Sequence, residues 1–124
     1  MKKIAVFGAG GFGREIHDMI EQINCKNQEY EFVGFFDDGI EKGTIVNSFP
    51  VLGGVYELNK FCSELCVVLA IGNPEIKRKV FEKISNPNIC FPTLIHPSVY
   101  IGNMKFNKIG NGCIICAGNI ITVN

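Results

Sequence analysis

The chain has 124 residues, 47% of them hydrophobic, and its twelve basic residues balance its twelve acidic ones. This length and composition suffice for one sizeable core plus a further short segment. The balanced charge lacks the electrostatic signature of a nucleic-acid-binding protein, so we expect no nucleic-acid partner. The apolar run after Met1-Lys2-Lys3 is too short for a signal peptide or a membrane span. We therefore expect a cytoplasmic protein with no membrane partner.

Six cysteines raise the question of a disulfide framework or a metal site. Without a secretory signal we expect no disulfides, and Cys62 and Cys90 lie in apolar stretches where free cysteine packs as a small hydrophobe. Cys113 and Cys116 have the spacing of a zinc knuckle, but they fall in a repeat whose slots favour small residues. Neither histidine of the chain has a partner at metal-ligand spacing. The sequence therefore predicts no metal site.

The first 39 residues predict a strand, a glycine-rich turn, a helix and a second strand. Residues 3–7 form an apolar run that enters the turn Gly8-Ala9-Gly10-Gly11-Phe12-Gly13. A helix follows, because apolar side chains recur at helical spacing, at Phe12, Ile16, Met19, Ile20 and Ile23. This pattern predicts that His17 faces water. Residues 30–36 then form a strand that ends at Asp37-Asp38-Gly39, which completes a βαβ unit.

The same alternation of strands and helices continues to residue 95. We expect an exposed loop over residues 40–48, a short strand and turn over 49–54, a helix over 55–61, a buried central strand over 66–71, a helix from Pro74 and a last strand over 89–95. In the helix from Pro74, the buried face is predicted at Ile76, Val80, Phe81 and Ile84. The run Lys77-Arg78-Lys79 is predicted to lie on its solvated face. Pro92 favours an edge position for the last strand.

Alternating strands and helices predict an α/β fold, a Rossmann-like parallel sheet with flanking helices over residues 1–95. Residues 96–124 follow a different pattern, in which Ile109, Ile115 and Ile121 recur every six residues. Six-residue spacing fits the coils of a parallel β-helix, which need further coils stacked on them. We therefore expect residues 96–124 to be the incomplete start of a hexapeptide-repeat β-helix.

Polar and glycine-rich groups are predicted to meet at one rim of the sheet, where the carboxyl ends of parallel strands gather. Gly8, Gly10 and Gly13 match the dinucleotide fingerprint, in which a pyrophosphate lies at a helix N-terminus. Asp37 follows the second strand, near where an NAD-binding protein places its ribose carboxylate. Each group also has a purely structural interpretation: the glycines as a tight turn, the aspartate pair as turn residues before Gly39, and Asn73 as a helix cap.

The order of short motifs along the whole chain resembles a family of sugar acetyltransferases. These motifs are Gly-Ala-Gly-Gly-x-Gly, Phe-x-Asp-Asp, Pro-Val-Leu-Gly, Ala-Ile-Gly-Asn, Ile-His-Pro-Ser and the Ile-Gly repeats. The chain is similar to the hexapeptide-repeat sugar O- and N-acetyltransferases of the sialic acid O-acetyltransferase and bacillosamine-pathway type (PglD-like, NeuD-like). The resemblance implies that the α/β domain binds a nucleotide-linked amino sugar or a sialic acid-type sugar. It also implies that a left-handed β-helix binds acetyl-CoA between the subunits of a homotrimer.

Carried over by motif, the resemblance assigns substrate contacts to residues at the predicted rim. They are Gly8, Gly10, Gly11, Phe12, Gly13, Asp37, Asp38, Gly72 and Asn73. Many members have histidine at the position of Phe12, so a polar contact is replaced by an apolar one in this chain. The implied catalytic histidine belongs to a part of the β-helix beyond residue 124, and neither His17 nor His96 matches it. The resemblance implies an acetyl-CoA-dependent acyltransferase, of which residues 1–124 are expected to be inactive alone; the alternative is an NAD(P)-binding or regulatory module without transfer chemistry.

Overall fold

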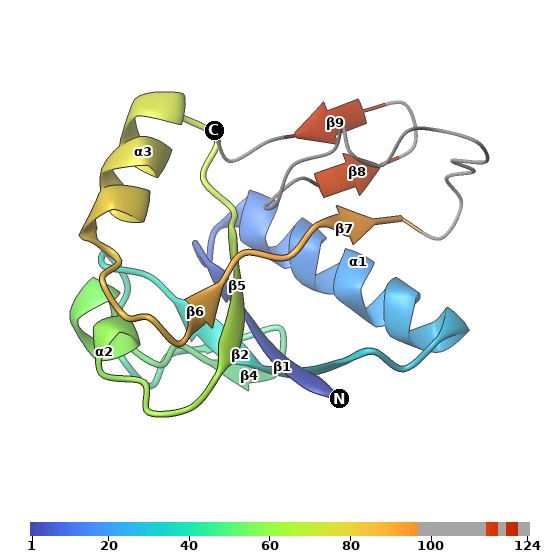
Figure 1. Cartoon of the computed structure of the whole chain (residues 1–124), viewed down its shortest axis with the longest axis horizontal. Helices are drawn as coiled ribbons and strands as arrows, with labels where there is room; N and C mark the ends of the chain where they lie inside the picture. The colour runs from blue at the N-terminus through green and yellow to red at the C-terminus, as the bar shows by residue number, and fades with distance from the viewer. Residues whose placement is uncertain (97–113, 117–118, 122–124) are drawn as a thin grey trace.

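The structure is a computed structural model that describes residues 1–96, 114–116 and 119–121 (Figure 1). In chain order the elements are β1 (Lys2–Phe7), α1 (Gly11–Lys26), β2 (Tyr30–Phe36), β3 (Ile45–Val46), β4 (Phe49–Pro50), α2 (Val55–Asn59), β5 (Leu65–Leu69), α3 (Pro74–Lys83), β6 (Ile89–Cys90), β7 (Leu94–Ile95), β8 (Ile114–Cys116) and β9 (Asn119–Ile121). Within the described residues no helix is long and apolar enough to cross a membrane.

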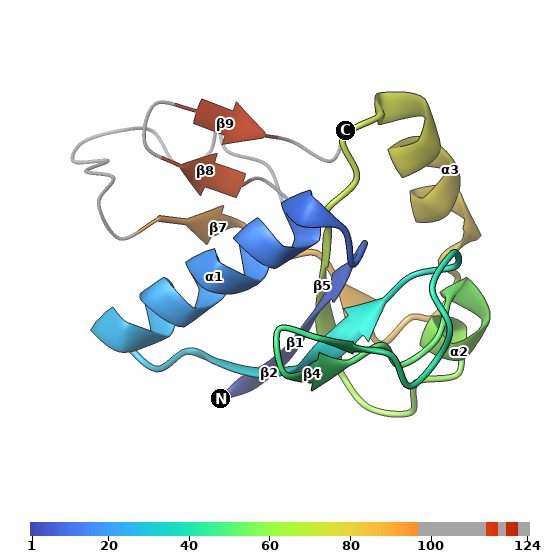
Figure 2. The same ribbon diagram turned by 180° about the vertical axis from the view of Figure 1, so that it is seen from behind.

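The main sheet has the strand order β2-β1-β5-β6, and each neighbouring pair runs parallel. Helix α1 lies on one face, and α2 and α3 lie on the other, as the two opposite views show (Figures 1 and 2). This arrangement confirms the predicted α/β fold, a parallel sheet with flanking helices. The short strand β6 lies at the edge of the sheet, as Pro92 indicated.

Two apolar clusters hold the layers together, one on each face of the sheet. Successive residues of β1 point to opposite faces, so Ile4 and Val6 pack with α1, whereas Ala5 and Phe7 join the cluster of α2 and α3. All five residues of β5 are buried. A central parallel strand covered on both faces is expected to be apolar throughout, which explains the continuous run Cys-Val-Val-Leu-Ala-Ile.

The segment predicted as an exposed loop over residues 40–48 contains a strand. Ile45 and Val46 pair antiparallel with Pro50 and Phe49 to form the β3–β4 hairpin. The two residues between them, Asn47 and Ser48, have φ angles of 48° and 70°. Positive φ at both central residues is typical of a two-residue hairpin turn, and Asn tolerates it well. The loop prediction is therefore wrong at its C-terminal end.

Helix α3 packs against the sheet through a face different from the predicted one. Val80 is buried as expected, but Ile76 is 52% exposed and Phe81 is 37% exposed. Lys77, predicted to face solvent, is 8% exposed, and this burial lowers the pKa of its ammonium group. The helix is rotated so that Lys77 is buried in place of Ile76, a position that the long aliphatic chain of lysine allows.

The C-terminal strands form a separate small sheet of order β7-β8-β9. The predicted strand over residues 89–95 is divided, because β6 belongs to the main sheet while β7 pairs parallel with β8. Strands β8 and β9 pair antiparallel, with Ile114 opposite Ile121. This hairpin differs from the parallel coils that the six-residue spacing predicts. Ile109 lies outside the described residues, and the β-helix stays a prediction.

Candidate functional site

The glycine-rich turn lies where the carboxyl ends of three strands meet. The Gly8 N–H donates to the Phe36 carbonyl oxygen at the end of β2, at 2.7 Å, and Gly8 has a φ of +112°. A Cβ atom on Gly8 would lie 2.6 Å from the Ala70 carbonyl oxygen, just after β5. Glycine is therefore required at this position by both conformation and space.

The remaining glycines of the turn divide into one that packs and two that leave space. A Cβ atom on Gly13 would lie 1.7 Å from the Gly8 carbonyl oxygen, so Gly13 lets α1 approach the turn closely. Gly10 and Gly11 are exposed, and a Cβ on either would meet no described atom within 4 Å. Gly13 thus serves packing, whereas Gly10 and Gly11 keep the backbone at the start of α1 open to a ligand.

Helix α1 begins at this turn with features suited to an anion. Gly10 is its N-cap and offers no capping side chain, and no acidic residue lies in the first turn. The first N–H groups of a helix and its macrodipole attract negative charge. The strand order β2-β1-β5 places this helix start at the point where successive crossovers change direction, which is where open α/β sheets bind ligands.

The paired aspartates lie at this rim, and both already accept backbone hydrogen bonds. Asp37 Oδ2 accepts from Ala9 N–H at 2.9 Å, and its Oδ1 accepts from Gly39 N–H at 2.8 Å. Asp38 Oδ1 accepts from Val55 N–H at 2.8 Å, at the first residue of α2. The aspartate pair therefore does have the structural role in a turn that the sequence also allowed. A carboxylate has about four acceptor positions, so each side chain retains capacity for a ligand hydroxyl.

Asn73 and Gly72 complete the rim on the other side of β1. Asn73 Oδ1 accepts from the N–H groups of Glu75 and Ile76, at 2.9 and 3.0 Å, and so caps α3. Its predicted alternative role as a cap is confirmed. Gly72 is exposed and has open space where a Cβ would be. The predicted site residues of the glycine turn, the aspartate pair and this turn therefore gather at one rim, whereas Phe12 packs, half-buried, against the core on the α1 side.

Two further residues that sequence reasoning did not single out support this rim. Glu57 Oε1 accepts from Gly54 N–H at 2.7 Å. This bond, followed by one from the backbone of Glu57 itself, lowers the pKa of the Glu57 carboxyl group. A Cβ on Gly54 would lie 2.0 Å from Asp38 Oδ1. The sequence does contain a pattern that could have indicated this contact. Glu57 follows Gly54 by three residues, and this spacing at a helix start is related to the capping box.

His17 is buried, which corrects the prediction that it faces water. It is 4% exposed, and its ring stacks on Phe32 with centroids 4.0 Å apart and meets the edge of Phe49 at 5.0 Å. Its Nε2 lies 3.4 Å from Glu21 Oε1, within reach of an ion pair but without hydrogen-bond geometry. The β3–β4 hairpin covers this flank of α1, and helical spacing alone does not reveal such cover.

The other sequence-derived chemical groups lie apart from the rim. His96 Nε2 bonds to Gln22 Oε1 of α1, which accords with a structural role. Among the described residues no group of three or more histidine, cysteine or acidic side chains is placed to hold a metal ion. Cys62 and Cys90 are exposed, so the prediction that they pack as buried hydrophobes is wrong, whereas Cys66 is buried.

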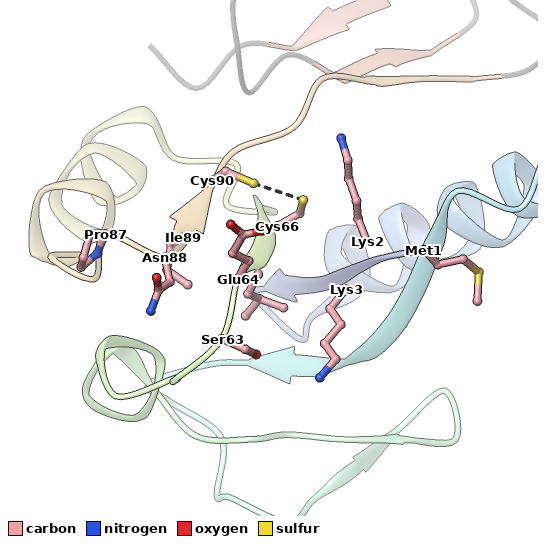
Figure 3. Close-up of a pocket in the computed structure, with 11 residues that line it drawn as sticks. Met1, Lys2, Lys3, Ser63, Glu64, Cys66, Pro87, Asn88, Ile89 and Cys90 are labelled. Carbon is pink, nitrogen blue, oxygen red and sulfur yellow. Dashed lines mark hydrogen bonds between the residues drawn. The ribbon is translucent and has the colours of Figure 1, made fainter.

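A pocket of about 670 Å³ opens at the opposite, amino end of the strands (Figure 3). It is lined by the first residues of β1 and by residues around the starts of β5 and β6, including Lys2, Glu64, Cys66 and Cys90. None of the predicted site residues lines it. We place the candidate functional site at the carboxyl rim and not in this pocket, because the glycine turn, the helix starts and the aspartates lie there.

Fold and rim together define a Rossmann-like α/β domain with a glycine-rich turn at its topological switch point. The PglD N-terminal domain matches residues 3–84, and the chain belongs to this family. The chain is 30% identical over 120 residues to a UDP-N-acetylbacillosamine N-acetyltransferase of Bacillus subtilis (strain 168), covering 94% of this chain and 52% of that protein. It is 30% identical over 124 residues to a GDP-perosamine N-acetyltransferase of Escherichia coli O157:H7, covering 100% of this chain and 55% of that protein.

Solved structures agree with this description of the fold. The acetyltransferase domain of PglB from Neisseria gonorrhoeae FA1090 is 32% identical, with a TM-score of 0.62, over 78% of this chain and 45% of that one. The same domain in complex with acetyl coenzyme A gives a TM-score of 0.59, over 77% of this chain and 44% of that one. The chain therefore spans about half the length of the relatives that it matches.

Proposed function

We propose that this chain forms the sugar-nucleotide-binding part of an acetyl-CoA-dependent amino-sugar acetyltransferase. The observation that carries this proposal is the glycine turn at the start of α1, with open space at Gly10, Gly11 and Gly72, at the switch point of the sheet. Family membership supports it, as do relatives named for transfer to UDP- and GDP-linked amino sugars.

In this proposal each group of the rim has a chemical task. The N–H groups at the start of α1 bind the diphosphate of the sugar nucleotide, whose charge the helix dipole stabilises. Asp37 and Asp38 keep acceptor positions for hydroxyl groups while their backbone bonds fix their orientation. The approach of backbone to phosphate at Gly10 and Gly11 depends on the lack of side chains there.

The transfer reaction needs groups that we do not assign to the described residues. Acetyl-CoA supplies the acetyl thioester, and a general base removes a proton from the attacking amine or hydroxyl. We propose that a histidine of a left-handed, hexapeptide-repeat β-helix is this base and that the same β-helix forms acetyl-CoA sites between subunits of a homotrimer. A cytoplasmic location belongs to the same proposal, since both substrates are charged metabolites.

The test is a calorimetric titration of the chain with UDP- and GDP-linked amino sugars, CMP-linked sialic acid, NAD and acetyl-CoA. We expect heat from at least one sugar nucleotide and weaker or no binding of NAD. Micromolar affinity for NAD with no response to any sugar nucleotide would favour the alternative, an NAD(P)-binding or regulatory module. That alternative rests on Asp37, which follows β2 where an NAD-binding domain places its ribose carboxylate.

Two variants at one position test whether the sugar nucleotide binds at this rim. Gly10→Asp and Gly10→Asn introduce side chains of equal size into open space, and both are good N-caps. We expect both variants to fold, and we expect the aspartate to weaken sugar-nucleotide binding on the order of tenfold more than the asparagine, because it places a negative charge beside the diphosphate. Equal affinity in the two variants and the parent would show that the diphosphate does not bind at the start of α1.

A further inference from the structure

Two cysteines from neighbouring strands face each other at the amino end of the sheet. Cys66 of β5 and Cys90 of β6 are direct register partners, and their Sγ atoms lie 3.2 Å apart. Figure 3 shows the two sulfurs pointing toward each other beside the pocket, with Lys2 extending on the same side. Both are free thiols.

The backbone holds this pair at a spacing that a disulfide accepts. Neighbouring strands lie about 4.8 Å apart, and disulfides join Cα atoms about 4.4 to 6.8 Å apart. An S–S bond is about 2.05 Å long, so the sulfurs need to approach by about 1 Å. Zinc and similar ions need further ligands, and in the described part of the chain no group of three or more histidine, cysteine or acidic side chains is placed to hold a metal ion.

The two thiols differ in their access to solvent. Both line the pocket, but Cys90 is exposed, whereas Cys66 is 5% exposed and belongs to the α1-side core. Burial, then the hydrogen bond and charge of Cys90, raise the pKa of the Cys66 thiol to about 12. At neutral pH Cys66 is therefore protonated, and the exposed Cys90 is the thiol that meets a reagent first.

We propose that Cys66 and Cys90 form a reversible thiol–disulfide site that low-molecular-weight disulfides oxidise. In the first step the Cys90 thiolate attacks one sulfur of the small disulfide, forms a mixed disulfide and releases one small thiolate. In the second step Cys66 loses its proton, its sulfur attacks Cys90 Sγ, and the second small thiolate leaves. Two protein thiols are thereby oxidised to one disulfide, and one small disulfide is reduced to two thiols.

The mixed disulfide prepares the second step. Once Cys90 is bonded to the reagent, it no longer carries the charge that opposes ionisation of Cys66, and Lys2 favours the Cys66 thiolate. The attacking sulfur is already within 3.2 Å of its target. Closure within one folded molecule therefore outpaces attack by a free thiol at low millimolar concentration. Cys25 and Cys62 are exposed cysteines of the same chain and serve as internal comparisons.

The test treats the native chain with glutathione disulfide at about 1 mM, followed by alkylation, proteolysis and mass spectrometry. We expect a peptide linking Cys66 to Cys90 that has lost two hydrogen atoms, at least about tenfold more abundant than the glutathione adduct of Cys90, and we expect dithiothreitol to reverse it. Cys25→Ser and Cys62→Ser should leave this link unchanged. A lasting glutathione adduct on Cys90 with Cys66 still free, or an unreactive Cys90, would overturn the proposal.

Two variants separate the steps without relying on the linked product. In Cys66→Ser, Cys90 should retain glutathione because no second thiol resolves the adduct. In Cys90→Ser, Cys66 should stay a free thiol because it is buried. In the unfolded parent chain the preference for the Cys66–Cys90 link should disappear, since it depends on the sheet register. The same preference in guanidinium chloride would show that the fold does not create the site.

Discussion

Single atoms decide which glycines of the turn are structural. The carbonyl oxygen of Gly8 occupies the position into which a Gly13 Cβ would project, at 1.7 Å, whereas Gly11 has no described atom within 4 Å of its Cβ position. The glycine fingerprint in the sequence does not separate these roles, because both positions are simply glycine there. The structure assigns Gly13 to helix–strand packing and leaves Gly11 at the open rim.

This difference predicts opposite effects of two alanine substitutions in the first turn of α1. Gly13→Ala should lower the free energy of unfolding by about 3 kcal/mol or more, because backbone must move to admit the methyl group. Gly11→Ala should be neutral or stabilising by up to about 1 kcal/mol, since alanine is the better helix former. Chemical denaturation of both variants measures the difference. Similar stabilities would contradict the close packing at Gly13.

The Glu57 carboxyl group predicts how the stability of the protein depends on pH. Its pKa is lowered in the folded protein from an ordinary value of 4.5, first by the Gly54 N–H bond. A depressed carboxyl pKa contributes stability above the unfolded pKa and loses it as pH falls through the folded pKa. Glu57→Gln should therefore have a lower unfolding midpoint than the parent at about pH 7, and the gap should close toward about pH 3. A gap that stays constant with pH would contradict this.

At the scale of elements, a buried asparagine joins α2 to the loop before β6. The Asn86 side-chain amide donates to the carbonyl oxygens of Leu58 and Phe61, at 3.1 and 2.8 Å, and its Oδ1 accepts from Asn88 N–H at 2.9 Å. The short helix α2 has only five residues and depends on such contacts. From the sequence, Asn86-Pro87-Asn88 indicates no more than a loop.

Removing this amide should loosen α2 and β6 together. Asn86→Ala removes the side-chain donor to the carbonyl oxygens of Leu58 and Phe61, and the Leu58 carbonyl oxygen keeps a bond from the Phe61 N–H at 3.1 Å. We expect this loss to cost about 1 to 3 kcal/mol and to lower the unfolding midpoint by roughly 5 to 20 °C. Asn88→Ala, at an exposed position of the same loop, is the matched control and should change the midpoint little. Differential scanning calorimetry distinguishes the two. Equal midpoints in both variants would mean that the amide does not tie these elements together.

The sequence predicts elements well where one face is buried by neighbours close in the chain. The strands and α1 follow from local apolar periodicity, and the rim follows from the rule that parallel strands end at one edge. Prediction from the sequence fails where a residue is buried by a segment that is distant in the chain. His17 is buried because the β3–β4 hairpin folds over α1, and α3 is rotated so that Lys77 is buried while Ile76 is exposed. Neither contact is encoded in local spacing.

At the scale of the whole molecule, the sheet has two chemically different ends. The carboxyl rim gathers the helix starts, the glycine turn and the aspartates, whereas the amino end carries the pocket with Lys2, Cys66 and Cys90. The glycine fingerprint directs attention to the rim. The cysteine pair escapes sequence reasoning because its members are 24 residues apart and meet only through the pairing of β5 with β6.

Strands β1 and β5 both run from the amino end to the rim, and β5 carries Cys66. Cys66 lies in β5 and Ala70 directly follows this strand, four residues further on, a separation of about 13 Å in extended chain. Sites more than about 7 to 10 Å apart without shared partners usually act additively. Forming the Cys66–Cys90 disulfide should therefore change the affinity for a sugar nucleotide by no more than about twofold. Titration of the fully reduced and fully oxidised chain measures this, with Cys90→Ser treated identically as the control for nonspecific oxidation. A tenfold or larger difference, absent from that control, would show that β5 transmits strain from the amino end to the rim and that oxidation regulates binding.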